Sequence, residues 1–205
     1  MKPFKLYGDH RSGNCYKVAL ILSLTGRSFE WVERDVMKQS TRTPQFLAMN
    51  PNGKVPVLQL PEGQYMAESN AMLLYLAEGS SYLPTDAWER ALVYQWLFFE
   101  QYSHEPYIAV ARFLVKLAGR EVEDAGRLKL LRKKGAGALR VMEKDLSSNL
   151  FLGGSRFSIA DIALYAYTHT AEEGGIDLSP WNAVRQWLLR VESVAGFVPM
   201  AQACG

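Results

Sequence analysis

The chain has 205 residues, of which 48% are hydrophobic and 21% are charged, proportions typical of a globular protein with one large core or two smaller ones. Its 23 Lys and Arg against 21 Asp and Glu give a formal net charge of +2, which argues against a nucleic-acid or anionic-membrane partner. Residues 18–24, the longest apolar stretch, are too few to span a membrane, and residues 1–10 contain no apolar signal core. With only two cysteines, we expect a cytoplasmic protein with free thiols.

The first third of the chain alternates strand and helix patterns. Residues 4–7 alternate as a strand does, residues 16–24 are an apolar helix, and residues 29–34 are a second strand rich in aromatic and branched side chains. Thr43 and Pro44 then open a short helix, because proline is tolerated in a first helical turn. The chain therefore starts with a βαβ unit followed by a helix.

A hairpin and a helix complete this first region. Residues 55–60 and 64–67 are predicted to pair as strands around the turn at 61–63, and residues 68–78 to form a helix that stops at Gly79. The resulting order is βαβ–α–ββα over residues 1–79. This order predicts an α+β domain.

Strand patterns are absent after this point. Residues 80–86 are typical of a linker, with Thr85 or Asp86 as the cap of the next helix. We predict that residues 87–205 form an all-α helical bundle. Its helices are expected at residues 88–117, 123–147, 159–172 and 181–194.

A turn from strand to helix at residues 11–18 is the first candidate binding feature. The unpaired N–H groups and the dipole at a helix start favour an anion. Ser12 and Asn14 lie at this start. The alternative is that both residues only cap the helix.

A proline inside an apolar strand is the second feature. Pro56 follows Val55 where a central strand is predicted, and proline is rare there. A cis bond would turn the backbone of Val55 outward, where it can pair with an extended peptide. An ordinary trans proline at the start of a strand is the alternative.

Glu68 and Ser69 are the third feature, at the start of the helix after the hairpin. The serine hydroxyl and free amides suit a carboxylate, and the Glu68 side chain suits an ammonium group. The alternative is an acid placed to compensate the helix dipole. Together the three features fit a short peptide that has a free amine, carboxylates and a thiol.

Four ordered motifs carry a resemblance to a known family: Ser12-Gly13-Asn14 with Lys17-Val18, the run 50–58, the run 67–71, and the run 157–162. Together they resemble the cytosolic glutathione transferases, most closely bacterial members near the theta and nu classes. The resemblance implies a thioredoxin-like glutathione-binding domain, a helical domain that carries an electrophile site, and a homodimer. In the run 157–162, Ser158 and Asp161 resemble the family's capping box, with Phe157 packed on Ile162, which is a structural motif.

The resemblance also implies roles for individual residues. Ser12 would contact the glutathione sulfur, and Asn14 also approaches it. The remaining implied contacts are Val55 with the cysteinyl backbone ahead of a cis Pro56, Glu68 and Ser69 with the γ-glutamyl end, and Lys54 with Gln39 or Lys38 at the glycine carboxylate.

One hydroxyl is enough to activate the thiol. An ordinary thiol has a pKa of about 8.5, and lowering it by roughly two units requires about 2.7 kcal/mol. A hydrogen bond to a charged group contributes roughly 1.5–3 kcal/mol. The helix start adds about 0.3–1 kcal/mol. We therefore expect no general base and no metal, since the three histidines show no metal-ligand spacing.

The predicted activity is conjugation of the glutathione thiolate, a co-substrate, to a small hydrophobic electrophile, a detoxification reaction. Tyr102, Tyr107 and Arg112, from the aromatic-rich helix, are the candidates to face that electrophile. Two alternatives stay open: a glutathione-dependent disulfide or peroxide reductase, and a non-catalytic binding module of the same fold. A mixed-disulfide mechanism at Cys15 is the rival to Ser12, because a cysteine in a first helical turn has a depressed pKa.

Overall fold

The computed structural model describes residues 2–203, which form two compact units. One unit contains Met1–Ser80 together with Val194–Gly205, and the other is Ser81–Ser193. The predicted helical domain covers the whole of residues 87–205. The segment from Val194 onward instead belongs to the first unit, where the Tyr16 hydroxyl donates to the Val198 carbonyl at 2.8 Å.

A four-stranded mixed sheet is the centre of the first unit. Its strands are β1 (Phe4–Gly8), β2 (Phe29–Glu33), β3 (Val57–Gln59) and β4 (Tyr65–Met66), in the spatial order β2-β1-β3-β4. β1 is parallel to β2 and antiparallel to β3, and β3 is antiparallel to β4. This arrangement confirms the predicted thioredoxin-like domain.

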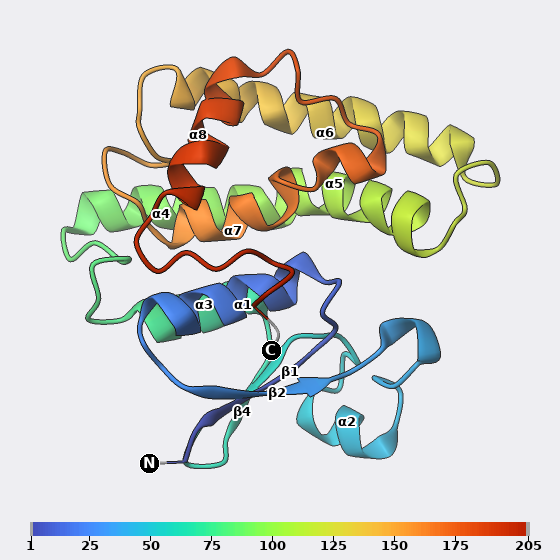
Figure 1. The fold of residues 1–205 in the computed structure, drawn as a ribbon, viewed down its shortest axis with the longest axis vertical. Coiled ribbons are helices and arrows are strands. Elements are labelled where there is room, and N and C mark those ends of the chain that lie inside the picture. The colour runs from blue at the N-terminus through green and yellow to red at the C-terminus, as the bar shows by residue number, and fades with distance from the viewer. Residues whose placement is uncertain (1, 204–205) are drawn as a thin grey trace. The chain divides into compact units, whose positions relative to one another are not determined.

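The helices of this unit cover the sheet because their apolar residues match its core face. Helices α1 (Gly13–Leu24) and α3 (Ser69–Ala77) pack against each other, and Figure 1 shows both on the side of the sheet opposite α2 (Pro44–Met49). Leu6 and Leu58, paired across β1 and β3, are fully buried, as is Leu20 of α1. Burial of each such side chain contributes about 1.5–3 kcal/mol.

The second unit is all-helical over the described residues, as predicted. It contains α4 (Ala87–Phe99), η2 (Glu100–His104), α5 (Glu105–Arg112), η3 (Phe113–Leu117), α6 (Ala125–Leu146), α7 (Ile159–Thr168), η4 (Ala171–Gly174) and α8 (Asn182–Glu192). The first four elements replace the single predicted helix, because η2 and η3 are π-helical segments. Pro106 explains the first of them, since proline lacks the N–H of a regular helical bond and displaces the preceding turn.

The centre of this unit is α7, in which every residue is buried. Its start carries the predicted capping box: Ser158 Oγ accepts from the Ala160 N–H at 3.2 Å, and Asp161 Oδ2 accepts from the Ser158 N–H at 2.9 Å. The ring of Phe157 packs edge-on against Tyr82 and Phe151.

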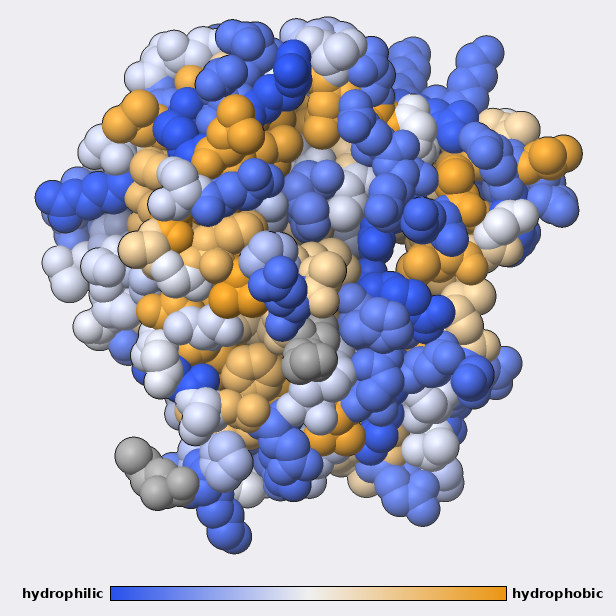
Figure 2. All heavy atoms as spheres, viewed as in Figure 1, coloured by the Kyte–Doolittle hydropathy of each residue, from blue (hydrophilic) through white to orange (hydrophobic). Residues whose placement is uncertain are grey.

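Hydrophilic residues occupy much of the face drawn in Figure 2, with hydrophobic residues between them. In residues 2–203, the helices are all too short or too polar to cross a membrane.

Candidate active site

The turn between β1 and α1 places Ser12 at the start of a helix. Ser12 has an extended backbone, with φ −87° and ψ 121°, and is the N-cap of α1. Its N–H donates to the Asp9 carbonyl at 2.9 Å, and its Oγ accepts from the Cys15 N–H at 3.4 Å. A hydroxyl that accepts in this way retains its own hydrogen for a further acceptor. The turn therefore presents a half-buried O–H donor where the helix dipole favours an anion.

The starts of α1 and α3 lie beside each other. The Ser69 hydroxyl, which is 5% exposed, donates to Asn14 Oδ1 at 3.3 Å. One turn further on, the buried Lys17 ammonium lies 3.4 Å from Asn70 Oδ1. Two helix N-termini in one place provide a stronger attraction for an anion than either alone.

Glu68, the N-cap of α3, adopts an unusual backbone conformation. Its φ is 69°, in the left-handed region that non-glycine residues rarely enter. Its exposed side chain makes no capping bond to α3. Such strain persists where the surrounding structure imposes it, often at ligand sites. The conformation leaves the carboxylate at the helix start accessible.

The bond between Val55 and Pro56 is cis, as the family resemblance implies, and not the trans bond that the local pattern left open. Strand β3 begins only at Val57, so Val55 lies outside the sheet ladder, contrary to the predicted start of the strand. The loop before it is held by Asn50, whose side-chain amide donates to the Lys54 carbonyl at 2.8 Å. The Lys54 side chain is exposed.

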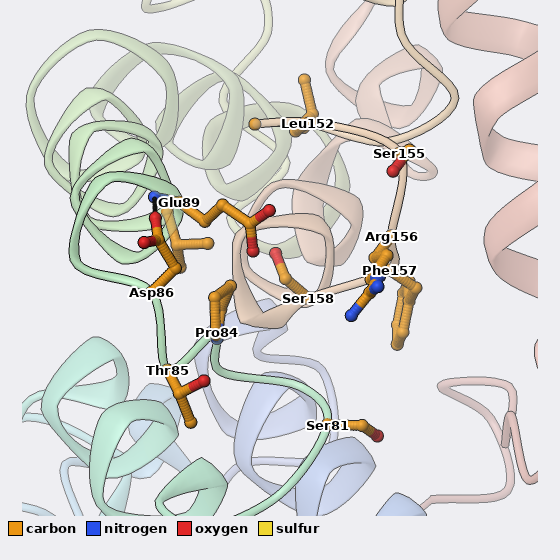
Figure 3. A pocket seen from close by; sticks show the side chains of 13 residues that line it. Ser81, Pro84, Thr85, Asp86, Glu89, Leu152, Ser155, Arg156, Phe157 and Ser158 are labelled. Atoms are coloured by element: carbon orange, nitrogen blue, oxygen red, sulfur yellow. Dashed lines mark hydrogen bonds between the residues drawn. The ribbon is translucent and has the colours of Figure 1, made fainter.

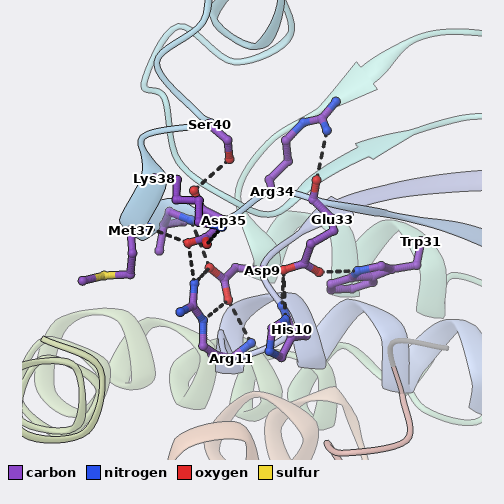
Figure 4. A network of polar contacts seen from close by, with 11 residues as sticks. Asp9, His10, Arg11, Trp31, Glu33, Arg34, Asp35, Met37, Lys38 and Ser40 are labelled. Atoms are coloured by element: carbon purple, nitrogen blue, oxygen red, sulfur yellow. Dashed lines mark hydrogen bonds and ion pairs between the residues drawn. The ribbon is translucent and has the colours of Figure 1, made fainter.

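Charged residues around Arg11, the residue that precedes Ser12, form a polar network (Figure 4). Asp9, at 1% exposure, accepts from Arg11 Nε at 2.8 Å and Nη2 at 2.6 Å, and from the Val36 N–H at 3.0 Å. Burial alone would raise the pKa of Asp9, but these bonds together hold it below its usual value. Asp35 accepts from Arg11 Nη2 at 2.7 Å. This network was not predicted from the sequence. Its local sign in the sequence is a pair of opposite charges, Asp9 and Arg11, two positions apart.

Gln39 and Lys38 follow directly from this network. Asp35 is the N-cap of the short turn η1 (Val36–Lys38), and Gln39 is its left-handed C-cap with φ 57°. Both side chains are exposed. The residues expected from the resemblance at the glycine carboxylate are therefore on a turn whose first residue is bonded to Arg11.

Asp9, His10 and Glu33 bring one potential metal ligand each to within 4.8 Å of one another. However, both carboxylate oxygens of Asp9 already accept bonds from the Arg11 guanidinium. Glu33 in turn accepts from Trp31 Nε1 at 2.7 Å and lies 2.9 Å from His10 Nδ1. Two separate sets of bonds, one between Asp9 and Arg11 and one joining Glu33 to Trp31 and His10, therefore account for the grouping.

Cys15 is fully buried, and its Sγ lies beside Gly8, where both it and the Trp31 ring would meet any side chain added at that position. Burial in apolar surroundings raises a thiol's pKa and limits access to it, whereas a nucleophilic cysteine needs the opposite. The geometry therefore favours Ser12 over Cys15 as the residue that meets a thiol.

The three electrophile candidates lie in different environments within the helical unit. Tyr102 in η2 is 83% exposed. Tyr107 in α5 has the Lys134 ammonium over its ring, 4.9 Å from the centroid. Arg112 is 8% exposed, and its Nε donates to Glu173 Oε2 at 2.7 Å. Their contact with an electrophile stays a prediction.

A cavity in the helical unit, of about 140 Å³, was not anticipated from the sequence. It lies between the start of α4 and the loop 152–158, and Figure 3 shows the side chains of Glu89, Arg156 and Ser158 around it. Asp86 caps α4 beside the cavity, accepting from the Trp88 and Glu89 N–H groups, each at 3.0 Å. Gly153, with φ 85°, and Gly154, with φ 151°, shape the loop, and this glycine pair is a signal of an unusual turn in the sequence.

A thioredoxin-like domain with an anion-favouring turn and a cis proline, followed by a helical domain, is the arrangement of a glutathione transferase. Two family profiles match this chain: the glutathione S-transferase N-terminal domain over residues 6–81 and the glutathione S-transferase C-terminal domain over residues 122–190. The chain belongs to the glutathione S-transferase family.

Three known proteins illustrate the similarity. The crystal structure of a glutathione S-transferase from Pseudomonas fluorescens Pf-5 has 53% sequence identity and a TM-score of 0.95, covering 97% of this chain and 99% of that one. A glutathione transferase family member from the same organism, with two glutathione bound, has 29% identity and a TM-score of 0.82, covering 94% and 89%. The disulfide-bond oxidoreductase YfcG of Escherichia coli K12 is 29% identical over 187 residues, which are 88% of this chain and 86% of the relative.

Proposed function

We propose that this chain is a glutathione transferase that joins the glutathione thiolate to an electrophilic carbon of an apolar compound. The observation that carries the proposal is the Ser12 hydroxyl, which caps α1 while keeping a hydrogen to donate. In the proposed mechanism this hydroxyl donates to the thiolate sulfur and lowers the thiol pKa. Asn14, whose side-chain oxygen accepts from the Ser69 hydroxyl, lies two residues after Ser12 in the first turn of the same helix.

The rest of glutathione fits the neighbouring groups. The backbone of Val55, outside the ladder ahead of cis Pro56, is available to pair with the cysteinyl unit. Glu68 and Ser69 at the start of α3 suit the γ-glutamyl ammonium and carboxylate. The exposed side chains of Lys54 and Gln39, with Lys38 as the alternative to Gln39, suit the glycine carboxylate.

The reaction needs no redox partner. The thiol proton leaves to solvent, the sulfur forms a bond to the electrophilic carbon, and either a leaving group departs with the bonding electrons or a double bond takes up a proton. Stabilising the thiolate raises the reactive fraction at neutral pH, because the thiolate is the nucleophile. Tyr102, Tyr107 and Arg112 remain our candidates to contact the electrophile.

The decisive experiment is Ser12→Ala. Loss of a hydrogen bond to a charged sulfur, worth about 1.5–3 kcal/mol, lowers the conjugation rate at neutral pH by roughly tenfold or more. Glutathione affinity changes little, because the other contacts remain. Ser28→Ala, an exposed serine in the same unit, is the matched control. A Ser12→Ala rate equal to that of the control would remove Ser12 from the mechanism.

Disulfide reduction is a second candidate, favoured by the similarity to the oxidoreductase YfcG. Here two glutathione molecules would reduce one disulfide, giving glutathione disulfide and two thiols, through the same Ser12-stabilised thiolate. Turnover on a chloronitrobenzene compared with turnover on a small dialkyl disulfide distinguishes the two reactions. The third alternative is a non-catalytic binding module, and a calorimetric titration that detects no affinity for glutathione would favour it.

The proposal includes a cytoplasmic homodimer of a bacterial class near theta and nu. Exposed aromatic side chains on α4, Trp88 at 71% and Phe98 at 72%, support a partner surface, since large exposed apolar groups mark interaction sites. Sedimentation of the full chain tests the dimer.

A further inference from the structure

Asp9 is the most heavily bonded side chain near Ser12. At the end of β1 and 1% exposed, it accepts four hydrogen bonds: three from the Arg11 N–H, Nε and Nη2, and one from the Val36 N–H. A buried carboxylate is stable only when paired and bonded in this way. The two-pronged contact with Arg11 also fixes the guanidinium plane.

The same guanidinium reaches a second segment of the chain. Arg11 Nη2 donates to Asp35 Oδ1 at 2.7 Å, so the guanidinium lies between two carboxylates (Figure 4). Asp35 also accepts from the Met37 N–H at 2.9 Å, and its carbonyl accepts from the Ser40 hydroxyl at 2.8 Å. Arg11 thereby connects the turn 9–12 to the turn 35–40.

These two turns carry different parts of the proposed glutathione site. Ser12 follows Arg11 directly and is further held by its N–H bond to the Asp9 carbonyl. Gln39 is the C-cap of the turn that Asp35 begins. The strand pairing of Gly8 with Glu33 brings the two turns to the same edge of the sheet.

We propose that Arg11 is a positioning residue that holds the Ser12 turn and the Gln39 turn at the spacing glutathione requires, with Asp9 and Asp35 as its anchors. This inference rests on the proposed function. Arg11 does not act as the cation for the thiolate, because its charge is already bonded to two carboxylates. Side-chain shape is therefore what matters, and lysine cannot reproduce it, since an ammonium lacks the planar fork that engages two carboxylates.

The test compares Arg11→Lys, Asp35→Ala and the wild type as full chains, with His10→Ala as control on the same turn. The His10–Glu33 pair is exposed, at 61% and 43%, and is not part of the link. The thiol pKa of bound glutathione is read from thiolate ultraviolet absorbance against pH, and KM and kcat are measured separately.

For Arg11→Lys, which keeps the charge, we expect the bound-thiol pKa to rise by about half a unit or more and the KM for glutathione to rise about fivefold. For Asp35→Ala, which keeps the Asp9–Arg11 pair, we expect a KM rise of about fivefold with kcat within roughly twofold and the thiol pKa unchanged. His10→Ala should match the wild type in each quantity.

A folded Arg11→Lys with wild-type thiol pKa and KM would overturn the inference, as would an Asp35→Ala with wild-type KM. If Arg11→Lys does not fold, Asp35→Ala decides alone, because Asp35 is partly exposed, at 29% of its side chain, and its replacement leaves Asp9 paired. Failure of the proposed function looks different: the wild type itself then shows no thiolate absorbance with glutathione.

Discussion

Each of the two units starts a helix with a serine N-cap close to a fully buried aspartate, but the bonding differs. In the helical unit, Asp161 accepts from the Ser158 N–H and is within 3.4 Å of its hydroxyl. In the thioredoxin-like unit, the Asp9 carboxylate instead accepts from Arg11 and Val36, and only the Asp9 carbonyl accepts from Ser12. Ser158 and Asp161 thus bond each other. The Ser12 hydroxyl accepts from the Cys15 N–H at 3.4 Å, which is longer than the 3.2 Å at which the Ser158 hydroxyl accepts from the Ala160 N–H.

The two aspartates also differ electrostatically. Asp161 accepts from four neutral donors: the N–H groups of Leu152 and Ser158 and the Trp187 indole, all within 2.9 Å, and the Ser158 hydroxyl at 3.4 Å. Burial raises its pKa to about 7, despite these bonds. The Arg11 guanidinium instead helps to hold the pKa of Asp9 below its usual value. A serine cap with a reciprocating carboxylate serves stability, and one whose carboxylate bonds elsewhere keeps a hydroxyl for a ligand.

Of the changes that test this comparison, removal of the Asp161 carboxylate should have the largest effect on stability. Asp161→Ala leaves three buried N–H donors without their acceptor, and each unsatisfied donor costs about 1–3 kcal/mol. We expect the free energy of unfolding to fall by roughly 3–5 kcal/mol in urea titrations. Asp177→Ala is the control, because Asp177 is exposed and bonds Ser179. A loss for Asp161→Ala no larger than for the control would contradict the structural role.

The fold could be read from the sequence because local patterns and global topology agree in it. The alternation at residues 4–7 and the apolar run in α1 are properties of neighbouring residues, and the confirmed order of elements follows from them. Element ends were less accurate. Helix α1 begins at Gly13, three residues before its apolar pattern, because the Ser12 cap determines the start and hydrophobicity does not.

Features that depend on long-range contacts escaped prediction. Asp35 meets Arg11 across 24 positions only because β1 and β2 pair in a particular parallel register. The segment from Val194 onward has no periodic pattern, and its place in the first unit depends on contacts such as the Tyr16–Val198 bond. At the site, the cis bond before Pro56 was predicted and found. The ligand roles of the surrounding residues stay predictions.

The two aspartates should give opposite pH dependences. The folded-state pKa of Asp161, about 7, lies above its unfolded value of about 3.9, so the folded state binds more protons between these values and stability falls as pH rises. The effect is up to roughly 1.4 kcal/mol per pH unit. The folded-state pKa of Asp9 is lowered, so its contribution is present above about pH 4 and is lost as pH falls.

Unfolding titrations from pH 3 to 8 of the wild type, Asp161→Asn and Asp9→Asn separate these contributions. The difference in free energy of unfolding between the wild type and Asp161→Asn should change with pH between about pH 4 and 7. The corresponding difference for Asp9→Asn should change with pH only below about pH 4. Parallel curves for all three proteins would show that neither aspartate titrates as the burial and bonding of its carboxylate require.

Removal of the two serine caps should have the smallest effect on stability, and it tests the comparison of Ser12 with Ser158 most directly. Loss of an N-cap hydroxyl costs about 0.5–2 kcal/mol. Ser158→Ala should lie near the middle of that range, because its bond to the Ala160 N–H is 3.2 Å long and fully buried, whereas Ser12→Ala should lie at or below the lower end, because its bond is 3.4 Å long. Activity should show the reverse order, with Ser158→Ala retaining conjugation at a temperature where it is folded and Ser12→Ala losing it. Equal stability losses with equal activities would mean that both serines are ordinary caps, and the hydroxyl that meets the thiolate would have to be sought elsewhere in the first unit.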